Sequence, residues 1–437
     1  MKTYKFMLIT LSVLFTWAAS GQQAINSELT QLVSRSFTYN PRISELQQNV
    51  MIQEERMDVA RTYLLPSVSA SGSYNYVAPV SQINFPVGPG VTQLLRFQPN
   101  NNINFGLGFN YQVLDFGRAR ANVEKTKTEI QQSKDNLEYN KAQLAAQVAT
   151  IYYGIAYLKS AITVQDSVLS SLAQTKRQAE SKLKNGDALE LDVLTINSNI
   201  DAEQNRKVEL ETLLDKQRTL LMYSTGVSSI NESISDFNFI PGAATGSNEE
   251  LAKRAEQTNL DFKMAEQRNS LTMHDWNINK RNYYPLISIV GNAGVRNGYQ
   301  PDMDAVRFNY LAGISISAPL FQGGRYRQQK QLFEATNTLN NLSIATLKRN
   351  YERDIAQATA DINSYTARLV NVKGQINQAQ KALEQTNSRY KNGIAIQVEY
   401  INALTTLQRI ELSALNFEYQ RCLGQIELAR ILGSKWW

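Results

Sequence analysis

The sequence predicts an α+β membrane protein built from a tandem internal duplication, in which each half contributes a β-hairpin and two long helices. Three observations carry this prediction. The ten prolines leave two long stretches free, one between Pro99 and Pro241 and one after Pro319. The two halves match each other at a constant spacing. Each half also contains a pair of segments that alternate between apolar and polar residues, as strands with one wet face do.

The amino terminus has the three parts of a secretory signal peptide over residues 1–21. Lys2 and Lys5 precede an apolar run from Phe6 to Trp17, and the small residues Ala18 to Gly21 follow. A membrane anchor is the alternative. It is disfavoured because the apolar run is shorter than the roughly 20 residues that span a bilayer as a helix. We therefore expect an exported protein.

The composition argues against several functional classes. The net charge of +6 falls to +4 once Lys2 and Lys5 are removed, and the scattered basic residues do not suggest nucleic acid binding. The single histidine, His274, and the single cysteine, Cys422, provide no metal cluster, no disulfide within the chain and no Ser/His/Asp triad. Cys422 lies far from the cleavage region, which argues against a lipid-anchored amino terminus. We expect no enzyme, no cofactor and no metal site.

A tandem duplication is visible in the spacing of matching segments. Gly117-Arg118 matches Gly324-Arg325, and Ser181 to Gly186 matches Ser388 to Gly393, both 207 positions apart. We assign residues 22–226 to a first structural repeat, 227–248 to a linker and 249–437 to a second repeat.

Each repeat should contain a helix, a hairpin, a long helix and a return helix. The long helices are expected over 118–185 and 325–391, because these stretches lack proline and carry helix-forming residues. At about 1.5 Å per residue, each would be about 100 Å long. Asn185-Gly186 and Asn392-Gly393 should end them, since Gly and Asn accept the left-handed conformation of a C-cap. Return helices follow over 189–223 and 398–432.

Both long helices carry a heptad seam of apolar residues with alternating spacings of three and four. In the second repeat the seam comprises Ile355, Ala358, Ile362, Tyr365, Leu369, Val372, Ile376, Ala379 and Leu383. In the first repeat it comprises Val148, Ile151, Ile155, Leu158, Ile162, Leu169, Leu172, Ala179 and Leu183, with Gln165 and Lys176 as polar interruptions. This pattern predicts coiled-coil packing rather than a globular core.

The hairpins are expected over about 67–113 and 286–318, where apolar or small residues occupy every second position. The alternating residues are Val68, Ala70, Gly72, Tyr74 and Tyr76, then Ile103, Phe105, Leu107, Phe109 and Tyr111, then Ile287, Ile289, Gly291, Ala293 and Val295, then Phe308, Tyr310, Ala312, Ile314 and Ile316. Segments of roughly 10 residues with this pattern are typical of transmembrane β-barrel strands, and an amphipathic sandwich in a soluble protein is the alternative. Four strands cannot close a barrel, which needs at least about 8, and open strand edges are not tolerated in lipid. Several protomers would therefore share one barrel.

The order of elements, given twice, resembles the TolC-type outer-membrane efflux protein family (outer membrane factors) over essentially the whole mature chain. Local strings support the resemblance: Tyr39-Asn40-Pro41, Leu65-Pro66, Leu114-Asp115-Phe116-Gly117-Arg118, Tyr284-Pro285, Pro319 to Arg325, and Arg389 to Gly393 followed by Glu399 and Ala403. Each string is weak alone. Their order, together with the spacing of 207, makes the match specific.

The resemblance implies a homotrimer with a shared transmembrane β-barrel of four strands per protomer, continued by a long α-helical coiled-coil barrel in the periplasm. It also implies a passive channel of a tripartite efflux or type I secretion system, with multidrug resistance as one outcome. The implied partners are outer-membrane lipid, a periplasmic adaptor (membrane fusion) protein and an inner-membrane efflux pump or secretion ATPase. Such a tube needs no catalytic residues and no cofactor.

The resemblance places a constricted entrance at the periplasmic helix turns, where rings of charge can select ions. Asp192 and Glu399 fall on entrance carboxylate positions, whereas Asn402 stands where well-known members have an acid, so cation binding there would be weaker. Lys184, Asn185, Gly186, Lys391, Asn392 and Gly393 are the adaptor-contact candidates. The alternatives are a solvated helix charge for Asp192 and Glu399, and a purely backbone role for the Asn-Gly pairs.

Other functions stay open at the level of sequence. A drug or metabolite duct and a protein-secretion duct share the same pattern, because cargo choice belongs largely to the pump. A non-conducting periplasmic coiled-coil scaffold is an alternative of another class. A hydrolase with an acidic pair is the weakest alternative, because the acidic residues follow helix surfaces and converge on no loop.

Overall fold

The computed structural model describes residues 27–228, 237, 239 and 246–437. The predicted signal peptide, and most of the linker predicted over 227–248, lie outside these residues. The chain divides into two compact units. The first contains the described residues up to 47, with 135–263 and 344–437, and the second contains 48–134 and 264–343. Each unit takes segments from both predicted repeats.

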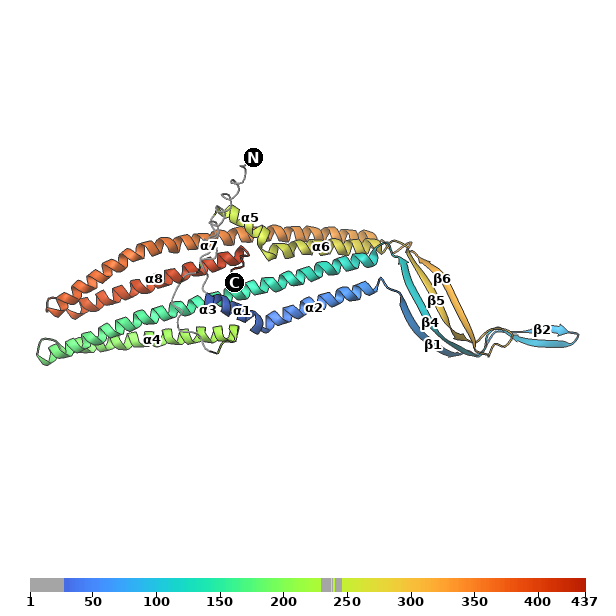
Figure 1. Ribbon diagram of the computed structural model, residues 1–437, viewed down its shortest axis with the longest axis horizontal. Coiled ribbons are helices and arrows are strands. Elements are labelled where there is room, and N and C mark those ends of the chain that lie inside the picture. Colours follow the sequence, from blue (N-terminus) through green and yellow to red (C-terminus); the bar gives the residue numbers. More distant parts are fainter. Residues whose placement is uncertain (1–26, 229–236, 238, 240–245) are drawn as a thin grey trace, which may run out of the picture. The chain divides into compact units, whose positions relative to one another are not determined.

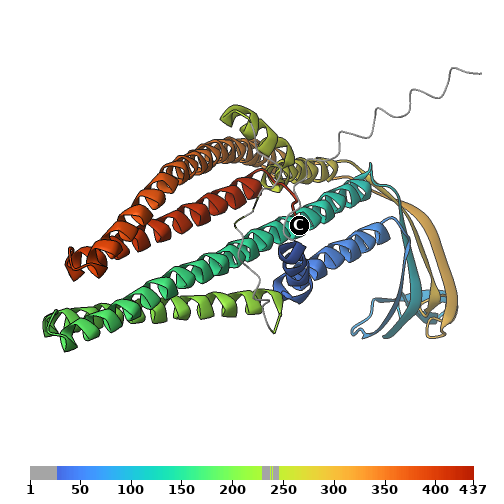
Figure 2. The same ribbon diagram turned by 60° about the vertical axis from the view of Figure 1, so that its left-hand side comes forward.

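The described residues form an α+β structure (Figure 1). The helices are α1 Ser27–Tyr39, α2 Pro41–Thr62, α3 Arg118–Lys184, α4 Glu190–Thr225, α5 Asn248–Thr258, α6 Leu260–Arg281, α7 Arg325–Lys391 and α8 Gln397–Ile431. The strands are β1 Ser67–Tyr76, β2 Gln82–Gly88, β3 Val91–Arg96, β4 Asn101–Leu114, β5 Leu286–Arg296 and β6 Arg307–Ser317. Figures 1 and 2 both show α4 running back along α3, and α8 running back along α7.

Corresponding elements of the two halves have matching lengths. Helices α3 and α7 each contain 67 residues and begin 207 positions apart. Helices α2 and α6 each contain 22 residues but begin 219 positions apart. The spacing between corresponding helices differs for the two pairs because the first half carries an additional hairpin, β2–β3. This hairpin lies in the connection from β1 to β4, between α2 and α3. The connection between the two long strands of the first predicted hairpin, which is rich in Pro and Gly and so suggests a loop, is therefore partly β-structure.

Side chains before the helices explain where several of them begin. The Asn40 side-chain oxygen accepts a hydrogen bond of 2.9 Å from the Arg42 amide, and the Asn259 oxygen accepts one of 2.8 Å from the Asp261 amide. Asp115 accepts hydrogen bonds from the amides of Gly117 and Ala119, at 2.8 and 2.6 Å. These bonds satisfy amides that a helix leaves unpaired in its first turn.

The four longer strands form one antiparallel sheet in the order β1-β4-β5-β6. Strand β4 pairs with β1 of its own hairpin and with β5 of the other half, so the sheet joins the two hairpins. Strands β2 and β3 form a separate two-stranded sheet. Among the residues that the structure describes, β1 and β6 each have one neighbouring strand in the larger sheet, so each presents one unpaired edge.

The heptad seams of the long helices are buried to a large extent. In α3, Val148 and Ile155 are fully buried, and in α7 so is Ile355. Gln165, a polar interruption of the predicted seam, is also fully buried. The seams therefore form the interior of the first unit, as a coiled coil requires.

The largest core cluster of the first unit gathers aromatic side chains from distant segments. Tyr153 contacts Phe239 edge to face with 5.9 Å between ring centroids, and Phe239 contacts Trp436 in the same manner at 5.1 Å. Cys422 belongs to this cluster.

No helix in the described parts of the chain combines the length and the apolar character of a bilayer-spanning helix.

Candidate functional site: a two-faced sheet and two helix turns

The register of the four-stranded sheet collects nearly all of its large apolar side chains on one face. Val68 pairs with Phe109, Leu107 pairs with Ala293, and Ala293 pairs in turn with Tyr310. Directly paired residues share a face, so the four apolar sets that the period of two predicts become one continuous surface. Its side chains are exposed, Val68 at 68% and Ile314 at 73%, although water does not favour large apolar patches.

The opposite face carries mostly small and polar side chains. Its members are Ser67, Ser69, Ser71, Ser73, Asn75, Asn102, Asn104, Gly106, Gly108, Asn110, Gln112, Leu286, Ser288, Val290, Asn292, Gly294, Arg296, Arg307, Asn309, Leu311, Gly313, Ser315 and Ser317. Three apolar residues break the pattern: Val290, Leu311 and Leu286, which pairs with Ser317 at one end of the sheet. A sheet with one apolar and one hydrophilic face suits a boundary between lipid and water.

The turn between α3 and α4 and the turn between α7 and α8 have similar backbone structures. Gly186 and Gly393 adopt positive φ angles of 83° and 74°. The Asp187 amide donates to the Lys182 carbonyl at 2.9 Å, and the Ile394 amide donates to the Arg389 carbonyl at 2.9 Å. Each of these bonds joins an amide to a carbonyl five residues earlier, as in a Schellman-type helix end. The residue before the donating amide has a positive φ there, which glycine adopts without a steric clash.

All six predicted adaptor-contact residues are exposed at these turns. They are Lys184, Asn185, Gly186, Lys391, Asn392 and Gly393. An added side-chain carbon at Gly186 or Gly393 would meet no atom within 4 Å. The surface around both glycines is therefore open, and the backbone conformation alone accounts for the residue type.

The two turns contact each other through side chains. The Lys182 ammonium donates to the Tyr390 carbonyl oxygen at 3.0 Å and lies 4.6 Å from the centroid of the Tyr390 ring. The side-chain amide of Gln397 donates a hydrogen bond of 2.9 Å to the main-chain oxygen of Asp192. Tyr390 stacks on Tyr400 with 5.8 Å between centroids. Burial and the nearby Asp192 carboxylate raise the pKa of Tyr390, so its phenol stays neutral at physiological pH.

The three predicted entrance residues have different surroundings. Asp192 is half-buried, and its carboxylate accepts a hydrogen bond of 3.0 Å from the Leu189 amide, so it caps α4. Glu399 and Asn402 are exposed on the first turns of α8. The main-chain oxygen of Asn402 accepts a hydrogen bond from Thr405 at 3.3 Å. Asp192 thus has a structural role in this chain whatever else it does.

A buried polar cluster joins α3, α4 and α8. Gln165 donates to the Glu203 carboxylate at 2.6 Å, and Gln408 donates to the same carboxylate at 2.8 Å and to the Gln165 oxygen at 2.9 Å. All three residues are buried. The sequence marks Gln165 as an interruption of the seam, but it gives no signal for Glu203 or Gln408, which look like ordinary polar residues of a helix surface.

The described residues include no group of three or more His, Cys, Asp or Glu side chains that could hold a metal ion. The His274 ring nitrogen lies 3.2 Å from the Thr128 hydroxyl, on neighbouring helices of the second unit. Cys422 is buried in the core, and burial raises the pKa of its thiol, which disfavours the reactive thiolate.

Comparison with protein families identifies the fold. A family model described as outer membrane efflux protein matches residues 32–227 and 251–434. The chain belongs to this family. As a member of the outer membrane efflux protein family, it is matched over nearly all of both predicted repeats, and the gap falls at the predicted linker. The predicted resemblance is confirmed.

Individual members of the outer membrane efflux protein family match along most of their length. The outer membrane efflux protein BepC of Brucella suis is 18% identical, over 98% of this chain and 90% of the relative. The outer membrane protein OprJ of Pseudomonas aeruginosa is 21% identical, over 94% of this chain and 85% of the relative.

Solved structures share the fold at similarly low identity. The outer membrane protein VceC of Vibrio cholerae matches with a TM-score of 0.75 and 17% identity, over 93% of this chain and 96% of that one. The outer-membrane channel OprN matches with a TM-score of 0.76 and 20% identity, over 94% and 91%. The α+β fold of the efflux family is thus shared although few residues are.

Proposed function

We propose that this chain is the outer-membrane channel subunit of a tripartite efflux or type I secretion system, and that it conducts substrates without catalysing a reaction. The observation that carries the proposal is the two-faced sheet, joined in the chain to helices of 67 residues. The apolar face suits lipid, and the face of Ser, Asn and Gly suits a water-filled lumen.

A homotrimer with one shared barrel follows from the free edges of the sheet. In lipid, every backbone group needs a partner, so the edges of β1 and β6 must pair with other copies of the chain. Three copies of a four-stranded sheet would supply twelve strands, above the minimum of about 8 for a closed barrel. The long helices of the same copies would continue the tube through the periplasm.

The cargo and partners are proposed at the level of class. Relatives carry names such as toxin and drug export protein A and pyoverdine export outer membrane protein OpmQ, which cover more than one kind of cargo. Our proposal for this chain is that an inner-membrane pump or secretion ATPase supplies the energy and that a periplasmic adaptor contacts the exposed turns around Gly186 and Gly393.

The deciding experiment is fractionation of cells that produce the full chain, followed by mass determination in detergent and conductance measurement in planar bilayers. A trimer from the outer-membrane fraction with stable conductance steps is the expected result. A monomer in the soluble periplasmic fraction, without conductance, would replace the channel by the scaffold alternative.

The role of Glu399 at the periplasmic entrance can be tested by conductance measurements in the same planar bilayers. We propose that Glu399, exposed on the first turn of α8, contributes a ring of charge at the periplasmic end. Glu399→Ala should weaken the block of current by multivalent cations added on that side. The matched variant Asp192→Asn should change it less, because the Asp192 carboxylate is already engaged by the Leu189 amide. An unchanged block in Glu399→Ala would remove Glu399 from the entrance.

A further inference from the structure

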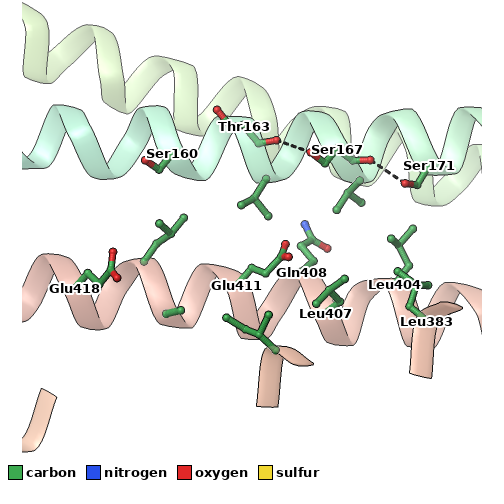
Figure 3. Close-up of a pocket in the computed structure, with 15 residues that line it drawn as sticks. Ser160, Thr163, Ser167, Ser171, Leu383, Leu404, Leu407, Gln408, Glu411 and Glu418 are labelled. Atoms are coloured by element: carbon green, nitrogen blue, oxygen red, sulfur yellow. Dashed lines mark hydrogen bonds between the residues drawn. The ribbon is translucent and has the colours of Figure 1, made fainter. Parts of the chain in front are cut away.

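A groove of about 550 Å³ lies within the first unit, bounded by α3, α7 and α8 (Figure 3). This volume lies in the range of about 300–1,000 Å³ that is usual for sites of drug-sized molecules. The groove is open to one side and separate from the helix turns. Neither the predicted adaptor contacts nor the predicted entrance residues line it.

The apolar part of the lining comes from three helices. It comprises Val164 and Val168 of α3, Ile376 and Leu383 of α7, and Leu404, Leu407, Ala414 and Leu415 of α8. These side chains would favour the removal of an apolar ligand surface from water. The groove thus combines an adequate volume with the predominantly apolar wall of a small-molecule site.

Three of the four hydroxyl groups on the α3 wall offer acceptors and no free donor, and the fourth belongs to Ser160. Thr163 donates to the Lys159 carbonyl at 3.1 Å, Ser167 to the Thr163 carbonyl at 3.0 Å, and Ser171 to the Ser167 carbonyl at 2.9 Å. These three hydroxyl hydrogens are used within the helix, so their oxygen lone pairs remain for a ligand, whereas the Ser160 hydroxyl can both donate and accept.

The α8 wall adds negative charge. Glu411 and Glu418 project from α8 toward α3 in Figure 3, and neither Lys nor Arg is among the 15 lining residues. The side-chain amide of Gln408 already donates to Gln165 and to Glu203. Partial burial desolvates the Glu411 carboxylate and thereby raises its pKa, and no cation among the lining residues offsets this.

From this lining we propose that the groove between α3 and α8 is a binding site for a bulky, hydrophobic organic cation, held by Glu411 and Glu418 against the leucine wall. The charge of the site selects a cation, because the groove presents carboxylates and hydroxyl oxygens without a basic side chain. The proposal is independent of conductance and stands or falls with binding to the intact chain.

The test uses a pair of probes with the same shape and opposite charge. Tetraphenylphosphonium and tetraphenylborate are titrated into the detergent-purified full chain by isothermal titration calorimetry, with empty micelles as the blank. Tetraphenylphosphonium should bind saturably and the borate should not. Glu411→Gln should weaken phosphonium binding about tenfold, which corresponds to about 1.4 kcal/mol. Glu209→Gln, at an exposed position of α4, should leave it unchanged.

A second variant tests the position of the site. Ala414→Trp fills the groove without changing its charge and should abolish phosphonium binding, with elution volume and circular dichroism unchanged. Equal binding of both probes, or binding that survives both Glu411→Gln and Ala414→Trp, would overturn the proposal. Absence of saturable phosphonium binding to the native chain would overturn the proposal as well.

Discussion

The side-chain amide of Gln165 donates a hydrogen bond of 2.6 Å to the carboxylate of Glu203, at a buried point where a polar residue interrupts the apolar seam of α3. Gln408 of α8 completes the cluster from the third helix. If a shifted alignment of the helices removed one member, a buried donor would lose its acceptor. Its desolvation would then be uncompensated, which lowers the free energy of unfolding. The cluster therefore favours one alignment of the three helices over shifted ones.

Removal of one member should destabilise more than removal of all three. Glu203→Ala removes the carboxylate that accepts from both Gln165 and Gln408, whereas Gln165 keeps its bond to the main-chain oxygen of residue 203 and Gln408 keeps its bond to the Gln165 oxygen. The loss of the two bonds to the carboxylate should cost about 1–3 kcal/mol in total. The triple replacement of Gln165, Glu203 and Gln408 by Leu should cost less than this single change. Thermal denaturation followed by circular dichroism measures both. As a control, Glu209→Ala, at an exposed position, should lie within about 0.5 kcal/mol of the native protein.

The contact between Lys182 and Tyr390 should restrain the two helix turns. Lys182→Met keeps the aliphatic stem but removes the charge that donates to the Tyr390 carbonyl and faces its ring. A cation over an aromatic ring contributes about 0.5–1 kcal/mol at an exposed site and more at a desolvated one, so this contact with the buried Tyr390 should contribute at least that much. Amide hydrogen exchange should therefore become a few times faster in residues 182–192 and 388–397.

Lys184→Met is the matched control for that experiment, because Lys184 is exposed in the same turn. It removes the same charge from the surface without touching Tyr390. If both variants accelerated exchange equally, general loss of charge rather than the contact would explain the effect.

The two faces of the sheet should differ in their tolerance of charge. Leu107→Arg places a guanidinium on the apolar face of β4, whereas Asn104→Arg places it on the polar face of the same strand. A charge facing lipid near the bilayer centre costs about 2–4 kcal/mol, and a charge facing a lumen costs little. Outer-membrane fractions should contain far less of Leu107→Arg than of Asn104→Arg. Equal amounts of the two variants would contradict the proposed membrane orientation.

The rate at which a maleimide labels Cys422 should show how rarely the core of the first unit opens to solvent. Its thiol is buried, and burial also raises its pKa, so little thiolate is present at pH 8. A maleimide should label the folded chain orders of magnitude more slowly than the chain in denaturant. Ser388→Cys, in a Cys422→Ala background, supplies an exposed thiol near the end of α7 that should react at once. Rapid labelling of native Cys422 would mean that the core opens readily.

Local features of the sequence determined the types of the elements. The long helices follow from proline-free stretches with a heptad seam, and their ends at Lys184 and Lys391 follow from the Asn-Gly pairs. The alternation of residues within each strand predicts which side chains share a face. These signals are readable because backbone preference and side-chain period act over a few neighbouring residues. Strand β2 also alternates, with Ile83, Phe85 and Val87 at every second position, but it contains Pro86. Proline argues against a strand, so the hairpin β2–β3 was not recognisable in a segment rich in Pro and Gly.

Only the tertiary structure decided which strands pair and which polar residues meet. The pairing of β4 with β5 joins strands from opposite halves of the chain and turns four separate apolar stripes into one face. The cluster of Gln165, Glu203 and Gln408, and the groove lined by Glu411, likewise unite residues far apart in sequence. A helix surface shows many such Gln and Glu residues, and only packing determines which of them leave water.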